Sequence, residues 1–402
     1  MCMPSRASRP WRHGISNSVL LMAAFLPLLF GGCRRVHFPK YPGNYREYAW
    51  ITNGGSNSVT VLDLVNMQPA ATIAVGANPT GIAVNPKRDE VYVTNSGSGS
   101  LSVIDAKTNR VVATLDVGRG PDWVDVDAAA DRAYVANAAS NNVSVVDLRR
   151  RREIGAIGVG EGPAEARISP DGQTLVVSNR TSGSVSIVDV HEWKVRAAFG
   201  DCPQASDTVI LPDSSQAFVA CTGTNHVMAI GLRRPQAQLA AQREDHLLAL
   251  LDVGPSPVHL ALKPDGGEIF VSNYGGDTVS EIATGNDDVG GAYLMGDHPL
   301  GGVVSADNST LWVSNEAANT IAAYSIDDGL LIHTVEVGEE PGPLALASNG
   351  FLLLALDTGS GDVSVLRTVS YKPKGEQVAG SLFTVLPAGK HPNAVAVMGY
   401  RE

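Results

Sequence analysis

The hydrophobic pattern of this chain repeats with a fixed period. Residues 91–118 (VYVTNSGSGSLSVIDAKTNRVVATLDVG) hold three apolar runs of strand length separated by polar turns. The first run ends in Asn95, and the equivalent positions follow one another at 42 residues, with one interval of 52. These positions are Asn53, Asn95, Asn137, Asn179, Cys221, Asn273, Asn315 and Asp357. Self-similarity of this kind predicts repeated copies of one supersecondary unit.

Each copy predicts four short strands. Apolar, β-branched runs such as Val103–Ile104 and Val111–Leu115 are broken by Asn, Gly, Asp and Ser. After the third apolar run of a copy comes a Gly. A Pro stands three residues after this Gly, and a fourth apolar run follows the Pro. The prolines are Pro79, Pro121, Pro163, Pro257, Pro299, Pro341 and Pro392. Four strands in roughly 40–45 residues are typical of a β-propeller blade.

The ends of the repeat predict a closed ring. The first copy begins at Tyr48 with the second strand of a blade, and Ala394–Val397 is a post-proline strand with no successor. We therefore expect the last strand to complete the first blade, which removes exposed sheet edges. The predicted fold is all-β, a single propeller over 48–402 with eight four-stranded blades. Seven blades with one degenerate copy is the alternative.

The repeat motif resembles a known family. The sequence YVTN at 92–95 has the variants VSNR, VSNY and VSNE, and it is followed by SVIDxxTNxVVATLxVGxxP. These motifs resemble the YVTN-repeat β-propellers, which are surface-layer-like proteins related to the propeller of haem-d1 nitrite reductases. The resemblance covers about 48–398 and implies the fold. It leaves the function open, because one fold hosts many roles.

The N-terminus follows a different pattern. Three arginines between residues 6 and 12 precede an apolar run over 19–30, which is too short to span a bilayer and indicates a secretory signal. The Gly-Gly-Cys that follows resembles a bacterial lipobox with Cys33 as the lipid acceptor. We expect a lipoprotein signal peptide at 1–32, a tether at 33–47 and attachment to a membrane of the cell envelope, outside the cytoplasm. An ordinary signal cleaved nearby and an uncleaved anchor are the alternatives.

Charge narrows the choice of partners. The net charge is −11, and removing residues 1–32, with their three arginines and no acids, takes it to −14. An acidic surface argues against nucleic acid and anionic lipid headgroups as partners.

Two cysteines remain after Cys2 and Cys33 are set aside. Cys202 and Cys221 flank one predicted hairpin, and disulfides persist outside the cytoplasm, so we expect a disulfide between them. Two free thiols are the alternative. No CxxCH haem-attachment motif is present in the sequence.

Candidate binding residues gather on one predicted face. The Gly-x-x-Pro loops and the Asn-ending turns share a face, which in propellers usually carries the ligand site. An arc of adjacent blades places polar or aromatic residues two positions after the aligned proline column. Other candidates lie close by, and two histidines directly precede prolines. The arc is Trp123, Glu165, Asp207 and His259; the additions are Asp122, Arg167, His298 and His391. Carboxylates and imidazoles suit a metal. The alternative is a hydrated mouth in which Arg167 neutralises Glu165 or Asp207.

Other repeated polar residues predict structure rather than chemistry. The aligned Asn residues, and Asp63, Asp105, Asp147 and Asp189, stand at turns in many blades, whereas one ligand site needs only one or two of them. Insertions at 233–245 and 370–380 fall on the face opposite the mouth. They indicate either a binding surface or tolerated loop growth.

The sequence supports three functional hypotheses. Serine-hydrolase, phosphate-loop and zinc-protease motifs are absent from it. The first hypothesis is a non-catalytic binding or scaffold lipoprotein, with a membrane and an envelope protein as partners and no cofactor. The second is a propeller enzyme, lactonase-like or quinoprotein-like, with a metal or cofactor on the arc. The third is a haem-d1-type subunit with His298 or His391 as the axial ligand.

Overall fold

The structure is a computed structural model that describes residues 41–234, 240–371 and 377–401. The predicted signal peptide, the candidate lipid acceptor Cys33 and the tether up to residue 40 lie outside these residues. The chain divides into two compact units, Met1–Pro42 and Gly43–Glu402, and the account below concerns the second. No helix in the described ranges has the length and apolar character needed to cross a bilayer.

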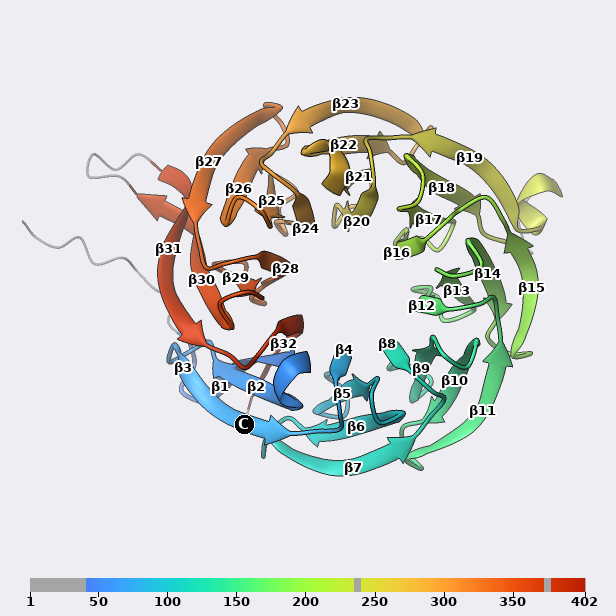
Figure 1. Cartoon of the computed structure of the whole chain (residues 1–402), viewed down its shortest axis with the longest axis horizontal. Helices are drawn as coiled ribbons and strands as arrows, with labels where there is room; N and C mark the ends of the chain where they lie inside the picture. Colours follow the sequence, from blue (N-terminus) through green and yellow to red (C-terminus); the bar gives the residue numbers. More distant parts are fainter. Residues whose placement is uncertain (1–40, 235–239, 372–376, 402) are drawn as a thin grey trace, which may run out of the picture. The chain divides into compact units, whose positions relative to one another are not determined.

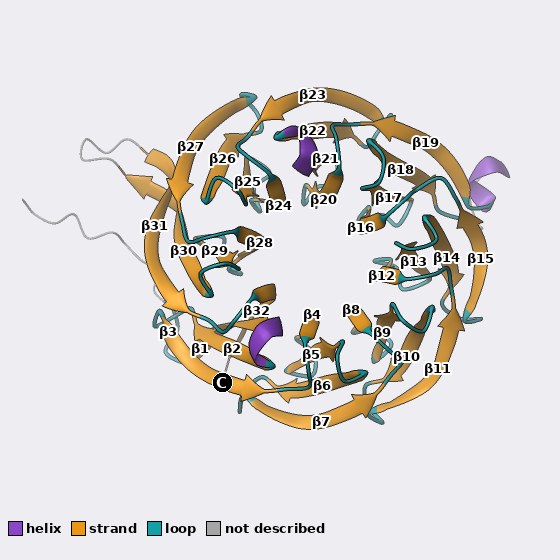
Figure 2. Ribbon diagram, in the orientation of Figure 1, coloured by secondary structure: helices purple, strands orange, loops and turns teal. Residues whose placement is uncertain are grey.

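The second unit consists of eight four-stranded antiparallel sheets arranged as blades around a centre (Figures 1 and 2). Blades 1 to 4, from the inner to the outer strand, are β32 (Pro392–Arg401), β1 (Tyr45–Asn53), β2 (Ser58–Asp63), β3 (Gln68–Ala74); β4 (Pro79–Asn85), β5 (Glu90–Asn95), β6 (Ser100–Asp105), β7 (Arg110–Asp116); β8 (Pro121–Asp127), β9 (Arg132–Asn137), β10 (Asn142–Asp147), β11 (Arg152–Gly158); β12 (Pro163–Ile168), β13 (Thr174–Asn179), β14 (Ser184–Asp189), β15 (Lys194–Phe199).

Blades 5 to 8 follow the same order. They are β16 (Ala205–Ile210), β17 (Gln216–Cys221), β18 (His226–Gly231), β19 (His246–Asp252); β20 (Pro257–Leu262), β21 (Glu268–Asn273), β22 (Thr278–Ala283), β23 (Asp288–Leu294); β24 (Pro299–Val304), β25 (Thr310–Asn315), β26 (Thr320–Ser325), β27 (Leu330–Glu336); β28 (Pro341–Leu346), β29 (Leu352–Asp357), β30 (Asp362–Tyr371), β31 (Gln377–Pro387). Three single-turn 3-10 helices are η1 (Gly54–Ser56), η2 (Ala240–Arg243) and η3 (Tyr274–Gly276).

The last strand closes the ring as predicted. β32 pairs antiparallel with β1, with Trp50 opposite Ala396, and the inner strands of blades 8, 1 and 2 lie side by side. This confirms eight blades and rules out the seven-blade alternative. β1 begins at Tyr45, so residues 45–47, which the sequence placed in the tether, belong to the strand. Buried Glu47 there accepts a hydrogen bond from the backbone N–H of Ser348 in blade 8, 2.5 Å away.

The hydrophobic core lies between blades. Trp50 and Val61 of blade 1, for example, pack with Val91 and Val93 of blade 2 in one buried cluster, and similar clusters recur around the ring. Successive side chains of a strand point to opposite faces of the sheet. A blade that has a neighbouring blade on each side is therefore apolar on both faces. A single blade cannot bury both faces by itself, and closure of the ring is therefore required for stability.

A Gly–Asn contact links successive blades. Gly118, in the connector between blades 2 and 3, lies so close to Asn137 that an added Cβ would stand 2.5 Å from the Asn Cγ. The Asn137 amide donates hydrogen bonds to Asn142 Oδ1 (2.9 Å) and Ser144 Oγ (2.8 Å). The same close approach recurs at Gly76–Asn95, Gly160–Asn179, Gly254–Asn273, Gly296–Asn315, Gly338–Asp357 and Gly389–Asn53. The repeated Asn residues therefore have a structural role.

A disulfide replaces this contact at the remaining junction. Cys202 stands where the other connectors have Gly, and Cys221 stands where the other blades have Asn or, in blade 8, Asp. The two cysteines are bonded with their Cα atoms 4.7 Å apart. The predicted disulfide is thus confirmed. Met228 occupies the position that Ser144 holds in blade 3, and Cys221 has no amide to donate to a hydroxyl there.

The two insertions enlarge outer hairpins. Residues 233–245 connect β18 to β19 in blade 5, and the second insertion lengthens β30 and β31 in blade 8. Both hairpins lie at the ends of the strands opposite the Gly-x-x-Pro connectors.

Substitution at the Gly–Asn contact provides a test of its importance. We expect Gly118→Ala to lower the free energy of unfolding by about 1–3 kcal/mol, because the new methyl group overlaps Asn137. Gly158→Ala in β11 is the matched control, since a Cβ there meets nothing within 4 Å. It should leave the stability unchanged or raise it slightly. Urea unfolding of both variants measures the difference, and equal midpoints would contradict the role of the contact.

Candidate functional site at the channel mouth

The structure brings the four residues of the predicted arc onto neighbouring inner strands. Trp123, Glu165, Asp207 and His259 lie on β8, β12, β16 and β20 of blades 3 to 6. In each of these blades the register between the inner strand and its partner shifts just after the first residue of the inner strand. A bulge of this kind re-aims the side chain that follows it. The repeated bulge therefore places one side chain per blade at the same level of the channel.

Ion pairs connect these residues into one group. Arg167 Nε lies 2.9 Å from Glu165 Oε1, and one of its terminal nitrogens lies 3.8 Å from Asp207 Oδ1. The guanidinium carbon stands 4.4 Å from the centroid of the Trp123 ring, within the range of a cation–π interaction. His259 Nδ1 lies 2.7 Å from Asp207 Oδ2. These contacts agree with the alternative reading of the sequence, in which the positive charge of Arg167 neutralises Glu165 or Asp207.

Both ring nitrogens of His259 are already engaged. Nδ1 donates to the Asp207 carboxylate, and Nε2 donates to the backbone carbonyl of Gly302 at 2.9 Å. Two acceptors require two N–H groups, so the geometry favours the imidazolium form. Burial by itself would lower the pKa of His259, but the attraction of Asp207 outweighs it and the pKa is raised. In this arrangement neither nitrogen is free to bind a metal or accept a proton.

Asp207 is held as the charged partner. Burial raises its pKa, but the His259 charge and hydrogen bond, Arg167 and the backbone N–H of Leu260 together outweigh burial, and the net pKa is lowered. The backbone N–H of Thr208 donates to the other carboxylate oxygen at 3.0 Å. Asp207 therefore anchors the group rather than offering a free ligand atom.

Glu165 has an unsatisfied carboxyl oxygen. Its side chain is 5% exposed, and Oε2 has no hydrogen-bond partner in the described part of the chain. Burial raises the pKa of Glu165 to about 8, with Arg167 opposing the shift and Asp207 adding to it. Burial also raises the pKa of Asp122, against the attraction of Arg180. The mouth thus contains two carboxyl groups whose ionised form is disfavoured by burial.

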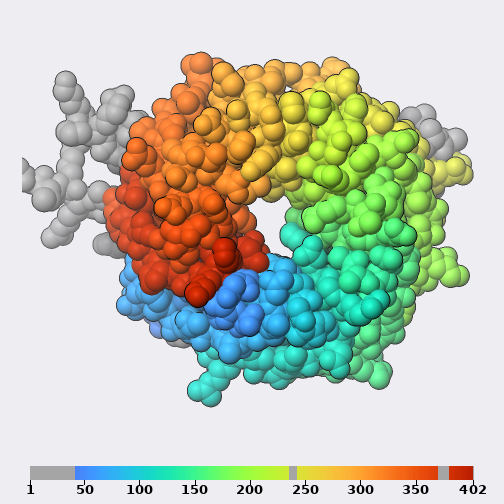
Figure 3. Space-filling view, viewed as in Figure 1, coloured from blue at the N-terminus to red at the C-terminus, as the bar shows by residue number. Residues whose placement is uncertain are grey.

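These groups line a cavity of about 360 Å³ at the central opening of the ring, which is visible in Figure 3. Its lining residues are Thr80, Gly81, Asp122, Trp123, Ala164, Glu165, Arg180, Ser206, Asp207, Val258, Asn393 and Ala394. Arg180 was missed by the sequence analysis. It directly follows the aligned Asn179, where most blades have a small or neutral residue, so a comparison of that column would have revealed it.

The structure does not bring the two predicted mouth histidines into this cavity. His298 and His391 lie in connectors with φ of 55° and 52°, and neither lines the cavity. The His298 ring stacks on Tyr274 with 4.4 Å between centroids. The ring of His391 lies against Gly55, where an added Cβ would stand 2.9 Å from its Cδ2.

The residues at the mouth do not fit a metal. Within residues 41–234, 240–371 and 377–401, no group of three or more His, Cys, Asp or Glu side chains is placed to hold a metal ion. His259 and Asp207 are committed to each other, and Glu165 pairs with Arg167. Among the described residues, the metal-binding version of the arc therefore lacks the three converging donors that a metal site needs.

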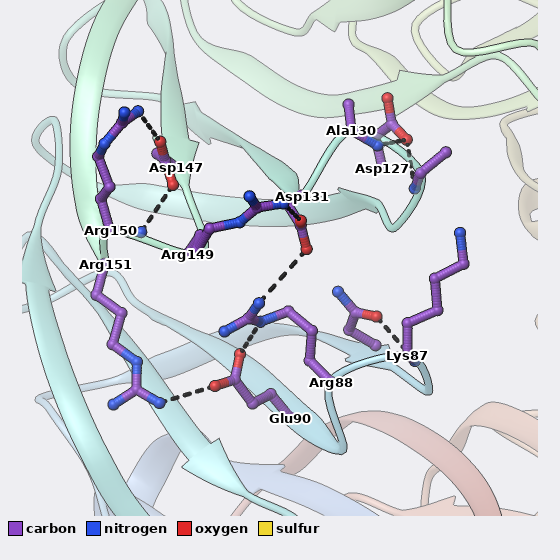
Figure 4. Close-up of polar contacts among 12 residues, drawn as sticks. Lys87, Arg88, Glu90, Asp127, Ala130, Asp131, Asp147, Arg149, Arg150 and Arg151 are labelled. Atoms are coloured by element: carbon purple, nitrogen blue, oxygen red, sulfur yellow. Dashed lines mark hydrogen bonds and ion pairs between the residues drawn. The ribbon is translucent and has the colours of Figure 1, made fainter.

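A second charged cluster joins blades 2 and 3 (Figure 4). Glu90 accepts from Arg88 Nε and from Arg151, each at 2.8 Å, and Asp131 pairs with Arg149 at 2.5 Å and with Arg88 at 3.4 Å. Part of the arginine run at 149–152 thus pairs with acids of both blades. We interpret this cluster as an inter-blade brace rather than an anion site.

Comparisons with known proteins agree with the fold. A family model described as a YNCE-like beta-propeller matches residues 40–168, so the chain is similar to such propellers over that stretch. No curated protein sequence matches the chain.

Several solved structures have a fold similar to that of this chain. Dihydro-heme d1 dehydrogenase NirN, in complex with DHE, has a TM-score of 0.67 at 16% identity, covering 89% of this chain and 76% of that one. Apo AztD from Citrobacter koseri has a TM-score of 0.65 at 14% identity, covering 88% and 98%. Kuenenia stuttgartiensis hydrazine synthase has a TM-score of 0.55 at 21% identity, covering 79% and 92%. At these identities the likeness shows the fold alone.

The buried Glu165 carboxyl predicts a pH-dependent stability. Because its folded pKa is raised, the protonated carboxyl contributes stability fully below the ordinary glutamate pKa, and this stability is lost as the pH rises through the raised pKa. Glu165→Gln stays neutral, so we expect it to gain stability relative to the natural protein, by on the order of 1–3 kcal/mol, between pH 5 and pH 9. Denaturant unfolding across this range measures the gain. Glu153→Gln, at an exposed position of β11, is the control, and a constant difference for Glu165→Gln would contradict the prediction.

Proposed function

We propose that this protein is a non-catalytic binding propeller outside the cytoplasm, and that it takes a positively charged ligand at the channel mouth. The observation that carries the proposal is the buried Glu165 carboxyl with its unpaired oxygen, set beside Asp122 and Trp123 in a cavity of about 360 Å³. A cation placed there favours the ionised form of both carboxyls, because opposite charge within a few ångströms offsets the cost of burial.

Acidic residues elsewhere on the mouth face also favour a positively charged ligand. On blades 6 to 8 the connectors and Asn-ending turns of the mouth face carry Asp277, Asp297, Glu316, Glu339 and Glu340. A surface with one dominant sign of charge raises the local concentration of oppositely charged ligands and their association rate.

The chemistry of the group favours binding over catalysis. His259 is held by two acceptors, and Asp207 is held by His259 and backbone N–H groups, so the pair lacks the free base that acid–base catalysis requires. A propeller enzyme, whether lactonase-like, quinoprotein-like or of haem-d1 type, is the alternative from sequence. No particular contact at the mouth favours it.

Two features support a place outside the cytoplasm. The Cys202–Cys221 disulfide persists in oxidising compartments and is rare in reducing ones. The N-terminal sequence adds a secretory signal that ends in a candidate lipid acceptor, Cys33. In this proposal the propeller is tethered to a membrane of the cell envelope, where an envelope protein is a further candidate partner.

A polyamine provides the test of the mouth site. We expect isothermal titration calorimetry with spermidine to show saturable binding that weakens with added salt, because the interaction is electrostatic. The double variant Asp122→Asn, Glu165→Gln should bind about tenfold more weakly or worse, a loss of about 1.4 kcal/mol. Glu339→Gln, on the same face but outside the cavity, is the matched control. Absence of heat, or equal affinity in the double variant, would refute a cation site here.

The membrane anchor has a separate test. Mass spectrometry of the protein purified from bacterial membranes should find the mature N-terminus at Cys33 with covalently attached acyl chains. Cys33→Ser should abolish the acylation and release the propeller from the membrane fraction, since anchoring requires the acyl chains. A mature N-terminus at another residue would exclude the lipoprotein.

A further inference from the structure

Blade 8 departs from the repeat at its aligned polar residue. In six of the other blades this residue is an Asn whose amide donates a hydrogen bond to a neutral side-chain oxygen five positions later. The pairs are Asn53–Ser58, Asn95–Ser100, Asn137–Asn142, Asn179–Ser184, Asn273–Thr278 and Asn315–Thr320. Blade 8 has Asp357 at the aligned position and Asp362 five positions later. Two carboxyl groups thus replace an amide donor and a neutral acceptor.

The Asp357 carboxyl occupies the place of the Asn amide. An added Cβ on Gly338 would lie 2.6 Å from Asp357 Oδ2, just as one on Gly118 would lie 2.6 Å from Asn137 Nδ2. Ser364, seven positions after Asp357, donates its hydroxyl to Oδ2 at 2.7 Å, and Asn137 Nδ2 makes the corresponding contact at 2.8 Å. Asp357 is fully buried. Its Oδ2 atom therefore stands where most blades have an N–H donor.

The two carboxyl groups of blade 8 face each other across the β29–β30 hairpin. Asp357 and Asp362 are directly opposite in the register of the two strands, and their side chains are in hydrogen-bond contact. Asp362 also accepts from the hydroxyl of Ser360 at 2.9 Å. An ionised carboxylate can only accept hydrogen bonds, so a bond between the two groups requires a proton on one of them. Two carboxylates that share a site repel each other when both are ionised.

The surroundings of the pair favour the protonated form. Burial, together with the hydrogen bond and the charge of Asp362, raises the pKa of Asp357 to about 7, against the hydrogen bonds from Ser364 and from the backbone N–H of Gly338. The strand β28, which pairs with β29, has no charged residue. The other charged residues near the pair are in the connectors before β28 and before β32, and they are Glu339, Glu340, Lys390 and His391.

We propose that Asp357 and Asp362 form a proton-dependent latch at the junction of blades 7 and 8. With one proton on the pair, Asp357 Oδ2 donates to Asp362 and takes over the role of the Asn amide, so the connector at Gly338 stays packed on the turn of blade 8. When the proton leaves, the two carboxylates repel each other and the turn separates from the connector more often. The latch lies outside the mouth cavity and does not depend on the ligand proposed there.

The raised pKa gives the direction of the pH effect. The protonated pair contributes its stability fully below the ordinary aspartate pKa, and this contribution is lost as the pH rises through about 7. Two backbone hydrogen bonds report on the junction, because they join the blade 8 turn to the connector. The N–H groups of Thr358 and Gly359 donate to the carbonyls of Glu340 and Glu339, each at 3.0 Å. We expect both bonds to open more often at alkaline pH.

Hydrogen exchange followed by mass spectrometry tests the latch. Between pH 5.5 and pH 8.5, a peptide with Thr358 and Gly359 should lose protection by about tenfold or more after correction for the chemical exchange rate, since one pKa unit corresponds to about tenfold. Ala138 and Ala139 provide the internal control. Their N–H groups make the equivalent bonds, at 2.9 and 3.1 Å, to the connector between blades 2 and 3, where the aligned residue is Asn137. Their protection should not change with pH.

Three variants complete the experiment. Asp357→Asn restores the residue of the regular blades, so it should fold and keep high protection at both pH values. Asp362→Asn removes the second carboxylate and should also remove the pH response. Asp116→Asn, at the exposed end of β7, is the matched control and should respond as the natural protein does. Protection at Thr358 and Gly359 that is independent of pH, an equal loss at Ala138 and Ala139, or an unchanged pH response in Asp357→Asn would each overturn the proposal.

Discussion

The close contact between a connector Gly and the Asn of the next blade fixes the geometry of this propeller. A side chain at Gly118 would overlap Asn137, so at this junction the connector backbone can approach the Asn of the next blade only because the position has no Cβ. The Asn in turn holds its own hairpin through hydrogen bonds to residues five and seven positions later. Repeated at every junction except that of the Cys202–Cys221 disulfide, the contact sets both the spacing of the blades and the entry point of the inner strands.

The site at the channel mouth depends on that entry point. Each of these inner strands starts after the connector and has a bulge just after its first residue, so the same position in consecutive blades faces the same level of the channel. Residues separated by 42 positions in the chain, such as Trp123 and Glu165, thereby become neighbours. The repeat keeps the backbone constant and leaves the side chains at this level free to differ from blade to blade. Function in a propeller is added in this way without changing the fold.

Departures from the repeat are as informative as the repeat itself. The disulfide replaces a Gly–Asn contact with a covalent bond, and the neighbouring hydroxyl position changes to Met228 at the same junction. The long hairpin of blade 8 replaces a turn, and among the described residues the buried Trp312 indole N–H has no equivalent of the hydrogen bond that Trp50, at the same repeat position, donates to Asn109. The other Gly junctions are the internal control for the disulfide, and Trp50 is the internal control for Trp312.

The sequence by itself determined the repeated strands and predicted eight blades and closure by the last strand, because these follow from a strict period and from positions that recur in it. It also predicted the disulfide, but the structure decided between eight and seven blades and between a disulfide and two free thiols. The sequence also placed Trp123, Glu165, Asp207 and His259 on adjacent blades. Only the tertiary structure decided how those side chains are used. Their charges are balanced by short contacts, and a backbone carbonyl from the next blade occupies His259. Such contacts depend on distances of a few tenths of an ångström between strands that are far apart in sequence, and a period in the sequence carries no information about them.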